Sequence, residues 1–501
     1  MNAQSHRIAR NGILTAISWF VPLIFSPIVT PILVRYLGNE QYGIYALAAG
    51  VIAYSGIGAG RAAAKYVAEY ESTHDTRGMV AAVSSVFWIT LGLAIALVVL
   101  VLLLREQLIT TVLQSADANG EGTEAALLIA VICAAVIMVT QVFQFALQGV
   151  HRFDTYLLLT NGTAFGINLG SVILALNGFG VVPIIILNLA FLTAAGVVFR
   201  IAVARAIPEL SLTLDIPGRF WSSTLRYAAS MLVYQAAGNA LLLFERGWIT
   251  RRFGAGELTY YVVPMLLPVY FHGFVSSVLS VIFPALNEVL EDPTRFSRLY
   301  RMATKLVTLL AGAFLVTIAV TGRSMLDLWV GRDFGNQSYT VLAVLALTFA
   351  LTAVATIAWQ AAEAIRKPSY NAWVVSLWAA AAIALMINTS IDTGLEGVAL
   401  ARLVGSFAFI PFIWLVHRLL PRTQALWLPL LARTLAVSLL VAIAEWTSLY
   451  FIQPEGLGFA VALIAGAAVA AVTVPAIGIF DKDELATLWS TFRSTLRVRS
   501  T

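Results

Sequence analysis

The sequence predicts an all-α, polytopic integral membrane protein with about fourteen transmembrane helices. Of its 501 residues, 60% are apolar and only 11% are charged, whereas about a quarter of the residues in soluble domains are charged. This composition cannot cover a water-facing surface, so most of the chain must lie in lipid. One span needs roughly 20 apolar residues. The chain therefore has no room for a large soluble domain beside the spans.

The individual spans are predicted from apolar stretches bounded by charges or by Gly, Pro and Asn turns. Arg7 and Arg10 precede the first stretch, but prolines interrupt it and no small-residue cleavage site closes it, so we expect a retained first helix. The predicted spans are 11–36, 42–64, 80–104, 125–150, 155–176, 181–203, 225–249, 258–285, 303–322, 340–363, 369–388, 398–416, 425–450 and 458–480.

Loop charges predict the orientation of these spans. An even number of spans places both termini on one side, and most of the 31 Lys and Arg residues then fall on that side. Because cytoplasmic loops are rich in Lys and Arg, both termini are expected in the cytoplasm. Arg246, Arg251 and Arg252 break the pattern, since they lie at the outer end of one hairpin.

An internal repeat relates the two halves of the chain. A shift of 216 residues superposes residues that lie mainly at span ends, namely Arg10 on Arg226, Arg35 on Arg251, Gly38 on Gly254, Tyr45 on Tyr261 and Gln144 on Gln360. We therefore expect two pseudo-symmetric six-helix lobes, residues 1–208 and 209–424, followed by two further helices within 425–480. Two bundles that move against each other around a central cavity form an alternating-access transporter.

The segment 481–501 places its apolar residues on one helical face and its arginines elsewhere. This pattern predicts a cytoplasmic amphipathic helix on the inner leaflet, with a solvated tail as the alternative. The apolar residues are Leu485, Leu488, Trp489, Phe492 and Leu496.

Ionisable residues near the spans are candidates for function, because a charge at mid-bilayer costs at least about 2.5–3.5 kcal/mol. Arg61 and Lys65 share one face at the inner end of the second span, just after a glycine-rich stretch. They could attract a phosphate group from the cytoplasm, or act only as positive-inside anchors. Glu245 and Arg246 end the seventh span, where they could line the mouth of a cavity or form an interfacial ion pair.

The repeat brings further cations to the same outer region. If the halves pack symmetrically, Arg35, Arg251 and Arg252 gather near that mouth. Guanidinium groups have forked donors that suit a pyrophosphate. Anchoring at the membrane surface is the alternative for at least one of them.

Amide side chains within spans are candidates for lining a polar cavity. Gln144 and Gln148 share one face of the fourth span with Gln141, and Gln360 with Glu363 repeats the theme in the tenth. These amides could contact sugars, but hydrogen bonds between helices are the more common role of intramembrane Gln. The same holds for Asn161 and Asn168, and His272 is expected to be a packed polar residue.

Several enzyme signatures are missing from the sequence. Its single cysteine, Cys133, lies in an apolar stretch and excludes a disulfide framework and a thiolate metal site. The sequence has no Walker loop, no His-Glu-x-x-His pair and no His-x-x-x-x-Asp acyltransferase pattern. The first outer loop holds only Glu40, where membrane glycosyltransferases usually have catalytic carboxylates. We therefore expect no cofactor, no catalytic residue and no metal ligand.

Three segments carry a family resemblance. Residues 37–46, LGNEQYGIYA, followed by 56–65, resemble the opening of bacterial polysaccharide flippases of the multidrug/oligosaccharidyl-lipid/polysaccharide exporter superfamily. Residues 244–261 resemble the acidic-Arg, Gly and Tyr pattern of helices seven and eight in this family, although Glu245 stands where Asp is usual. Residues 281–286, VIFPAL, resemble its helix-eight ending. The resemblance extends to about residue 420.

This resemblance implies a two-lobed transporter in the bacterial inner membrane. Its expected substrate is a polyprenyl-pyrophosphate-linked oligosaccharide, moved to the outer leaflet for surface polysaccharides such as the O-antigen of lipopolysaccharide or an exopolysaccharide. A cationic cavity would hold the pyrophosphate and sugars, and the last two helices would shelter the polyprenyl chain. Its expected partners are membrane lipids, H⁺ or Na⁺ as a coupling ion, and the polysaccharide polymerase and assembly machinery, with no nucleic acid.

Two other functions stay open. A cation-coupled multidrug exporter of the same superfamily would need acidic residues deep in the first lobe, and none is found there. A membrane-embedded glycosyl- or acyltransferase would need the carboxylate loop or the histidine motif.

Overall fold

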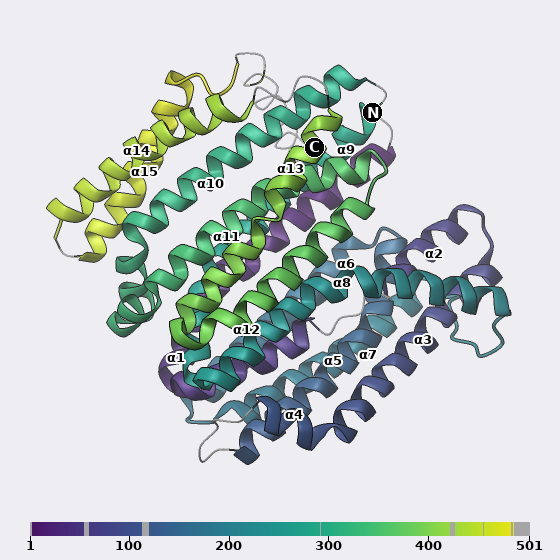
Figure 1. Ribbon diagram of the computed structural model, residues 1–501. Helices are drawn as coiled ribbons and strands as arrows, with labels where there is room; N and C mark the ends of the chain where they lie inside the picture. Colours follow the sequence, from purple (N-terminus) through teal and green to yellow (C-terminus); the bar gives the residue numbers. More distant parts are fainter. Residues whose placement is uncertain are drawn as a thin grey trace. The chain divides into compact units, whose positions relative to one another are not determined.

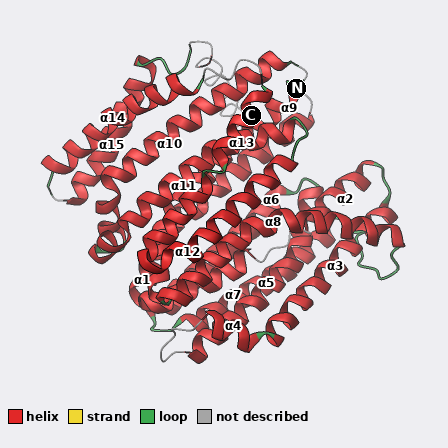
Figure 2. Ribbon diagram, viewed as in Figure 1, coloured by secondary structure: helices red, strands yellow, loops and turns green. Residues whose placement is uncertain are grey.

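The computed structural model describes residues 3–54, 60–112, 120–290, 292–420, 426–453, 455–481 and 484. These residues form helices joined by short turns, and the described part contains no strand (Figure 2). The predicted all-α class is therefore confirmed. The helices fall into two compact units, Phe20–Thr259 and Met1–Trp19 with Tyr260–Thr501.

The unit Phe20–Thr259 is arranged around helix α5. Helices α2, α3 and α7 pack against α5, and α6 packs against α7 (Figure 1). A buried cluster beneath them includes Val67, Val86, Phe143 and Phe199. The helices of this unit are α1 (Ala3–Tyr54, from Phe20 onward), α2 (Arg61–Ser72), α3 (Thr76–Leu103), α4 (Arg105–Val112), α5 (Gly120–Gly149), α6 (Phe153–Leu176), α7 (Val181–Ala206) and α8 (Gly218–Phe253).

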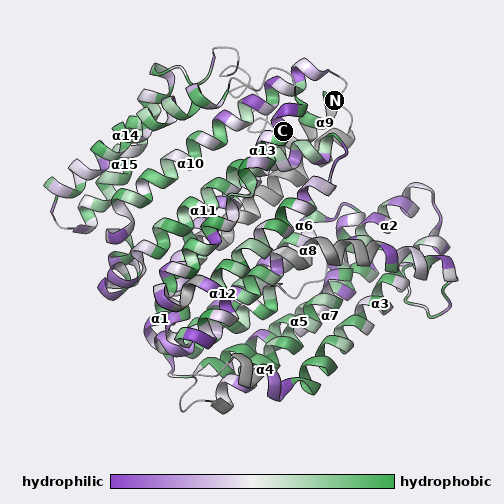
Figure 3. Cartoon of the chain, in the orientation of Figure 1, coloured by the Kyte–Doolittle hydropathy of each residue, from purple (hydrophilic) through white to green (hydrophobic). Residues whose placement is uncertain are grey.

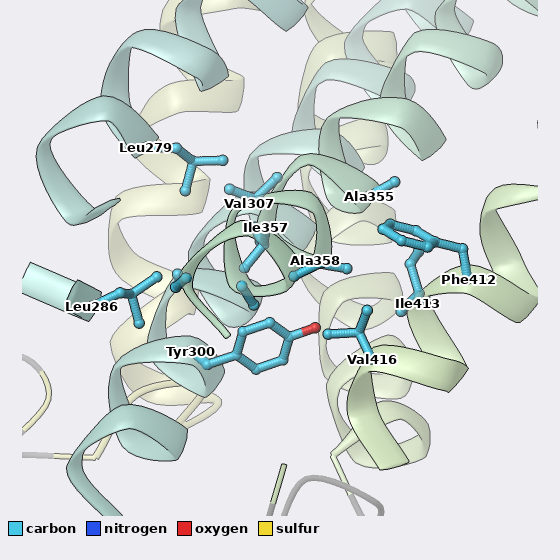
Figure 4. Packing of buried hydrophobic residues seen from close by; sticks show 14 of the residues in the cluster. Leu279, Leu286, Tyr300, Val307, Ala355, Ile357, Ala358, Phe412, Ile413 and Val416 are labelled. Atoms are coloured by element: carbon cyan, nitrogen blue, oxygen red, sulfur yellow. The ribbon is translucent and has the colours of Figure 1, made fainter. Parts of the chain in front are cut away.

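The unit with Tyr260–Thr501 is arranged around helices α10 and α11, which pack against each other. Helices α14 and α15 pack together and lie beside α10, while α12 and α13 pack on α11 (Figure 1). Tyr300, Ile357 and Phe412 meet in its core (Figure 4). The helices are α9 (Ala255–Glu288, from Tyr260 onward), α10 (Pro293–Trp329), α11 (Arg332–Ala364), α12 (Ser369–Ser406), α13 (Phe409–Leu419), α14 (Trp427–Phe451) and α15 (Glu455–Ala476).

Eleven helical segments in the described residues are long and apolar enough to span a membrane. They coincide with the third to sixth and the eighth to fourteenth predicted spans. The other three predicted spans fall on α1 and α8, and α1 breaks at Gly38, between the first and second. Apolar residues predominate along many of these helices (Figure 3). Many large apolar side chains are exposed, including Leu435 with 71% exposed. The protein is therefore a multi-pass membrane protein.

The backbone repeats the same breaks in both halves of the chain. Gly38 and Gly254 end corresponding helices with φ of 75° and 97° and the same ψ of 164°. Gly178 and Gly394 form the next equivalent pair, with φ of 80° and 62°. Because glycine adopts positive φ without a steric penalty, these positions set where each helix stops. The predicted internal repeat is thus confirmed in the fold, while the exact lobe boundaries 1–208 and 209–424 stay a prediction.

The ends of α5 and α11 also correspond. His151 and Arg366 both have positive φ, at 58° and 61°. In each case the next amide donates a hydrogen bond back into the last helical turn, from Arg152 to Leu147 at 2.9 Å and from Lys367 to Ala362 at 2.8 Å. This Schellman-type ending is unusual for a residue other than Gly or Asn. Its recurrence in both halves supports the repeat independently of the glycines.

The segment after α15 is fixed to α10 by an ion pair. Lys305 Nζ lies 2.7 Å from Glu484 Oε2, and both side chains are largely buried. The same carboxylate oxygen accepts a hydrogen bond of 2.9 Å from the amide of Asp481. Apart from Asp481 and Glu484, the amphipathic helix predicted for 481–501 lies outside the described residues.

Candidate functional site

Arg246 lies in a tight contact between α8 and α1. Its guanidinium donates a hydrogen bond to the main-chain carbonyl of Ala46. A Cβ atom at Gly50 would lie 2.8 Å from the Cδ atom of Arg246 and 2.9 Å from its Nη1 atom. Gly50, one turn beyond Ala46, therefore provides the space that the side chain occupies. The arginine is half-buried, so part of it stays accessible.

Glu245 precedes Arg246 and is buried, with 1% of its surface exposed. A buried carboxylate in an apolar bundle is costly unless it is paired or hydrogen-bonded. Successive residues of a helix point about 100° apart, so α8 directs the two side chains to different sides. The sequence left open a cavity mouth or an ion pair at the membrane surface; the burial of Glu245 places it inside the bundle.

Two turns related by the repeat pack against each other in this region. The hydroxyl of Thr259 donates a hydrogen bond of 2.6 Å to the main-chain carbonyl of Asn39. Close by, Gly43 faces the carbonyl of Ala255 so tightly that a Cβ atom at residue 43 would overlap it. The turn at Gly38 and the turn at Gly254 are therefore held together by a side chain–backbone hydrogen bond and by a close backbone approach.

The predicted cations Arg35 and Arg251 occupy equivalent places beside these turns. Each lies three residues before the glycine with positive φ. Arg35 is exposed and Arg251 is half-buried. Arg252 is exposed, and its guanidinium carbon lies 5.1 Å from the ring of Trp248 in a cation–π contact. The turns thus bring Arg35 and Arg251 into one region of the Phe20–Thr259 unit.

Arg61 is the first residue of α2 and is exposed. The preceding Gly60 packs on α5, where a Cβ atom would lie 3.1 Å from the main chain of Gln141. Lys65, also exposed, lies with its Nζ atom 5.2 Å from the ring of Tyr66. The expected common face of Arg61 and Lys65 is consistent with their four-residue spacing on α2.

The predicted glutamines lie in two different units. Gln144 and Gln148 are half-buried on α5, and Gln360 is half-buried on α11. The Oε1 atom of Gln360 is buried and has no hydrogen-bond partner in the described chain, which is unusual for a buried amide. Glu363, its predicted companion, is exposed and accepts a hydrogen bond of 2.9 Å from the indole of Trp359. The two residues therefore do not form one polar cluster.

Arg402 on α12 is a buried cation that the sequence analysis missed. Only 2% of it is exposed, and its guanidinium carbon lies 5.1 Å from the ring of Phe349 and 5.5 Å from the ring of Trp378. The Nε2 atom of His272, nearby on α9, lies 3.4 Å from the hydroxyl of Thr356. His272 therefore packs against this threonine. An arginine inside the span 398–416 was the available signal for this site.

Glu445 on α14 is a second buried ionisable residue that sequence reasoning missed. It is 1% exposed. The hydroxyl of Thr317 on α10 donates a hydrogen bond of 2.7 Å to its Oε1 atom, while its Oε2 atom is buried without a partner in the described chain. A Cβ atom at Gly466 on α15 would lie 2.6 Å from Oε1. This side chain therefore joins the last two helices to α10.

Comparisons with known proteins agree with this architecture. Among curated proteins, one from Shigella flexneri named "Putative O-antigen transporter" is 21% identical over 406 residues, covering 79% of this chain and 94% of that protein.

Two solved structures share the fold. The lipid II flippase MurJ in an inward closed conformation has a TM-score of 0.76 at 15% identity, covering 93% of this chain and 98% of that one. An inward-facing MATE-family multidrug transporter of the MOP superfamily has a TM-score of 0.62 at 16% identity, covering 85% of this chain and 97% of that one.

These likenesses confirm the transporter fold that the resemblance implied. The family model described as "Polysaccharide biosynthesis protein" matches residues 8–290. Because this match covers more than half of the chain, the protein belongs to the polysaccharide biosynthesis protein family.

Proposed function

We propose that this protein is a flippase for polyprenyl-pyrophosphate-linked oligosaccharides, which it moves from the cytoplasmic to the outer leaflet of a bacterial inner membrane for surface polysaccharide synthesis. The observation that carries the proposal is the pair of repeat-related halves whose helices break at equivalent residues, Gly38 with Gly254 and Gly178 with Gly394. Such halves suit alternating access. The family and the O-antigen transporter relative support a lipid-linked saccharide as the substrate.

The pyrophosphate of this substrate would be bound by cations of the Phe20–Thr259 unit. Arg246 is held in place by Ala46 and Gly50 and stays partly accessible. Arg61, the first residue of α2, would attract the pyrophosphate at the inner end of the second span. Arg35 and Arg251, which flank the two packed turns, would bind it at the outer end. Guanidinium groups bind phosphate oxygens through paired, charge-assisted hydrogen bonds. Glu245 would balance the positive charge of this region when no substrate is bound.

The sugars would be bound by amides. Gln144 and Gln148 on α5, and Gln360 on α11, are half-buried and can each donate and accept hydrogen bonds. The buried oxygen of Gln360, which has no hydrogen-bond partner in the described chain, would accept a hydrogen bond from a sugar hydroxyl only in a state of the cycle that exposes it. The topology and partners are proposed as well. Both termini would lie in the cytoplasm, and a gradient of H⁺ or Na⁺ would drive the transport cycle. The polysaccharide polymerase would receive the translocated oligosaccharide.

Complementation of a deletion strain tests the site. Arg246→Ala and Arg61→Ala are expected to reach the membrane at normal levels and to restore surface polysaccharide poorly. The matched control is Arg105→Ala. This arginine is exposed, is not among the proposed site residues, and forms an ion pair with Glu124, with 3.2 Å between Nε and Oε1. Full rescue by both site variants would reject the cationic site, even if the wild-type protein proves to be a flippase.

A further inference from the structure

An apolar groove lies on the surface of the Phe20–Thr259 unit. It has a volume of about 690 Å³. Its floor is one face of α5, from Ile132 through Val136 to Phe143, and its walls come from α3 and α7, which both pack against α5. Ile95 and Val197 on the two walls are 55% and 56% exposed. The groove is therefore open to the surrounding lipid along its side.

The walls of this groove offer almost no polar groups. The two threonines that line it donate their hydroxyl protons to their own helices, Thr140 to Val136 at 2.8 Å and Thr193 to Leu189 at 2.8 Å. A ligand of the groove must therefore be mainly apolar. From Phe87 to Val99 the α3 wall rises about 18 Å, which matches an extended hydrocarbon chain in length.

Among the described residues that line the groove, Arg200 on α7 is the one with a charged side chain. It is half-buried, and its guanidinium carbon lies 5.9 Å from the ring of Phe143 at the end of the floor. In the described chain it has no carboxylate partner and no hydrogen bond. A half-buried cation against apolar walls gains stability from an anion that satisfies its donors.

Arg200 also lies near the end of its helix. It precedes the end of α7 at Ala206 by six residues, a rise of about 9 Å. Arg205, in the last turn of α7, is exposed. Long basic side chains near a span end extend toward the membrane surface. The guanidinium can therefore reach the phosphate of a lipid whose chain lies along the groove.

We propose that this groove binds an anionic phospholipid, with one acyl chain on α5 between α3 and α7 and its phosphodiester on Arg200. A single guanidinium matches the single charge of a phosphodiester. A pyrophosphate carries more charge, and no second cation lines the described groove. The ligand is thus a membrane lipid distinct from the transported substrate.

Native mass spectrometry of the full-length protein in detergent tests this site, with phosphatidylglycerol and phosphatidylethanolamine as probes. The wild-type protein is expected to retain phosphatidylglycerol in preference. Arg200→Ala should weaken this binding about tenfold, the loss of roughly one charge-assisted interaction, and Arg200→Lys should restore part of it. Arg205→Ala is the matched control, because it removes an arginine from the same helix outside the groove.

A second variant separates lost binding from lost folding. Ala135→Trp fills the floor of the groove without touching Arg200, and should also reduce phosphatidylglycerol binding in protein that keeps its thermal stability. Equal retention of the two lipids, or full binding by Arg200→Ala, would overturn the proposal. So would displacement of phosphatidylglycerol from this site by undecaprenyl pyrophosphate at equal concentration, which would make the groove a substrate site.

Discussion

The hydroxyl of Thr259 donates a hydrogen bond of 2.6 Å to the main-chain carbonyl of Asn39, 220 residues earlier in the chain. These residues flank the turns at Gly38 and Gly254, which are equivalent in the internal repeat. Two corresponding turns therefore pack on each other through this hydrogen bond and through the close approach of Gly43 to the carbonyl of Ala255. If the two repeat-related halves move against each other in an alternating-access cycle, this contact is expected to form in one state and open in another.

Cross-linking these turns should stop transport. In a Cys133→Ala background, cysteines at Asn39 and Thr259 joined by a short bifunctional thiol reagent are expected to abolish translocation. A reducible reagent should allow activity to return after reduction. Each single cysteine serves as a control for modification alone. Normal transport by fully cross-linked protein would show that the turns stay packed throughout the cycle.

Gly50 is expected to control the position of Arg246. Gly50→Ala places a methyl group within about 3 Å of the arginine side chain, and overpacking of this kind typically costs about 1–3 kcal/mol. Transport should fall several-fold while membrane insertion is unchanged.

Gly247→Ala is the matched control for Gly50→Ala, because a Cβ atom there meets no atom within 4 Å. Complementation and membrane abundance are measured together for both variants. Equal activities would argue that Arg246 does not need its present position.

Gly178 should be required for its backbone conformation alone. It has φ of 80°, and a Cβ atom there would have no neighbour within 4 Å. Gly178→Ala should therefore destabilise the protein by roughly 1–2 kcal/mol through strain only. Gly162→Ala, in open space within helix α6, should be neutral or slightly stabilising. Thermal unfolding in detergent compares the two, and a larger loss in Gly162→Ala would contradict this account.

Glu445 is expected to act through the shape and hydrogen bonding of its side chain. Gln keeps the oxygen that accepts the hydrogen bond from Thr317, so Glu445→Gln should retain stability and transport. Glu445→Ala removes the contact with Thr317 and leaves a void beside Gly466, and should lower thermal stability. Loss of transport in a stable Glu445→Gln protein would instead indicate that the carboxyl group itself takes part in the cycle.

Most of the fold could be predicted from the sequence, because lipid imposes one simple requirement. Each span needs about 20 apolar residues, and eleven predicted spans match helices of the described chain. The repeat could also be predicted, since Gly38 and Gly254 have to be glycines at positive φ. In both cases the residue types within a short stretch of sequence were enough to predict the structural feature.

The contacts of the site could not be predicted in the same way. The groove beside Arg200 and the aromatic rings around Arg402 are formed by helices distant in sequence. The space for Arg246 depends on Gly50, almost 200 residues earlier. A sequence shows that an arginine lies in a span, but the packing of helices decides what it contacts. The roles of the predicted site residues therefore stay predictions.

Reconstitution of the purified protein tests directly whether it translocates a lipid-linked oligosaccharide. Purified protein is placed in vesicles with a fluorescent polyprenyl-pyrophosphate-linked oligosaccharide in one leaflet, and its appearance in the other leaflet is followed with a membrane-impermeant quencher. A flippase should translocate this lipid faster than it moves in empty vesicles, and Arg246→Ala should slow the translocation. No movement of this lipid in vesicles whose protein exports a cationic dye would contradict the account and favour a multidrug exporter.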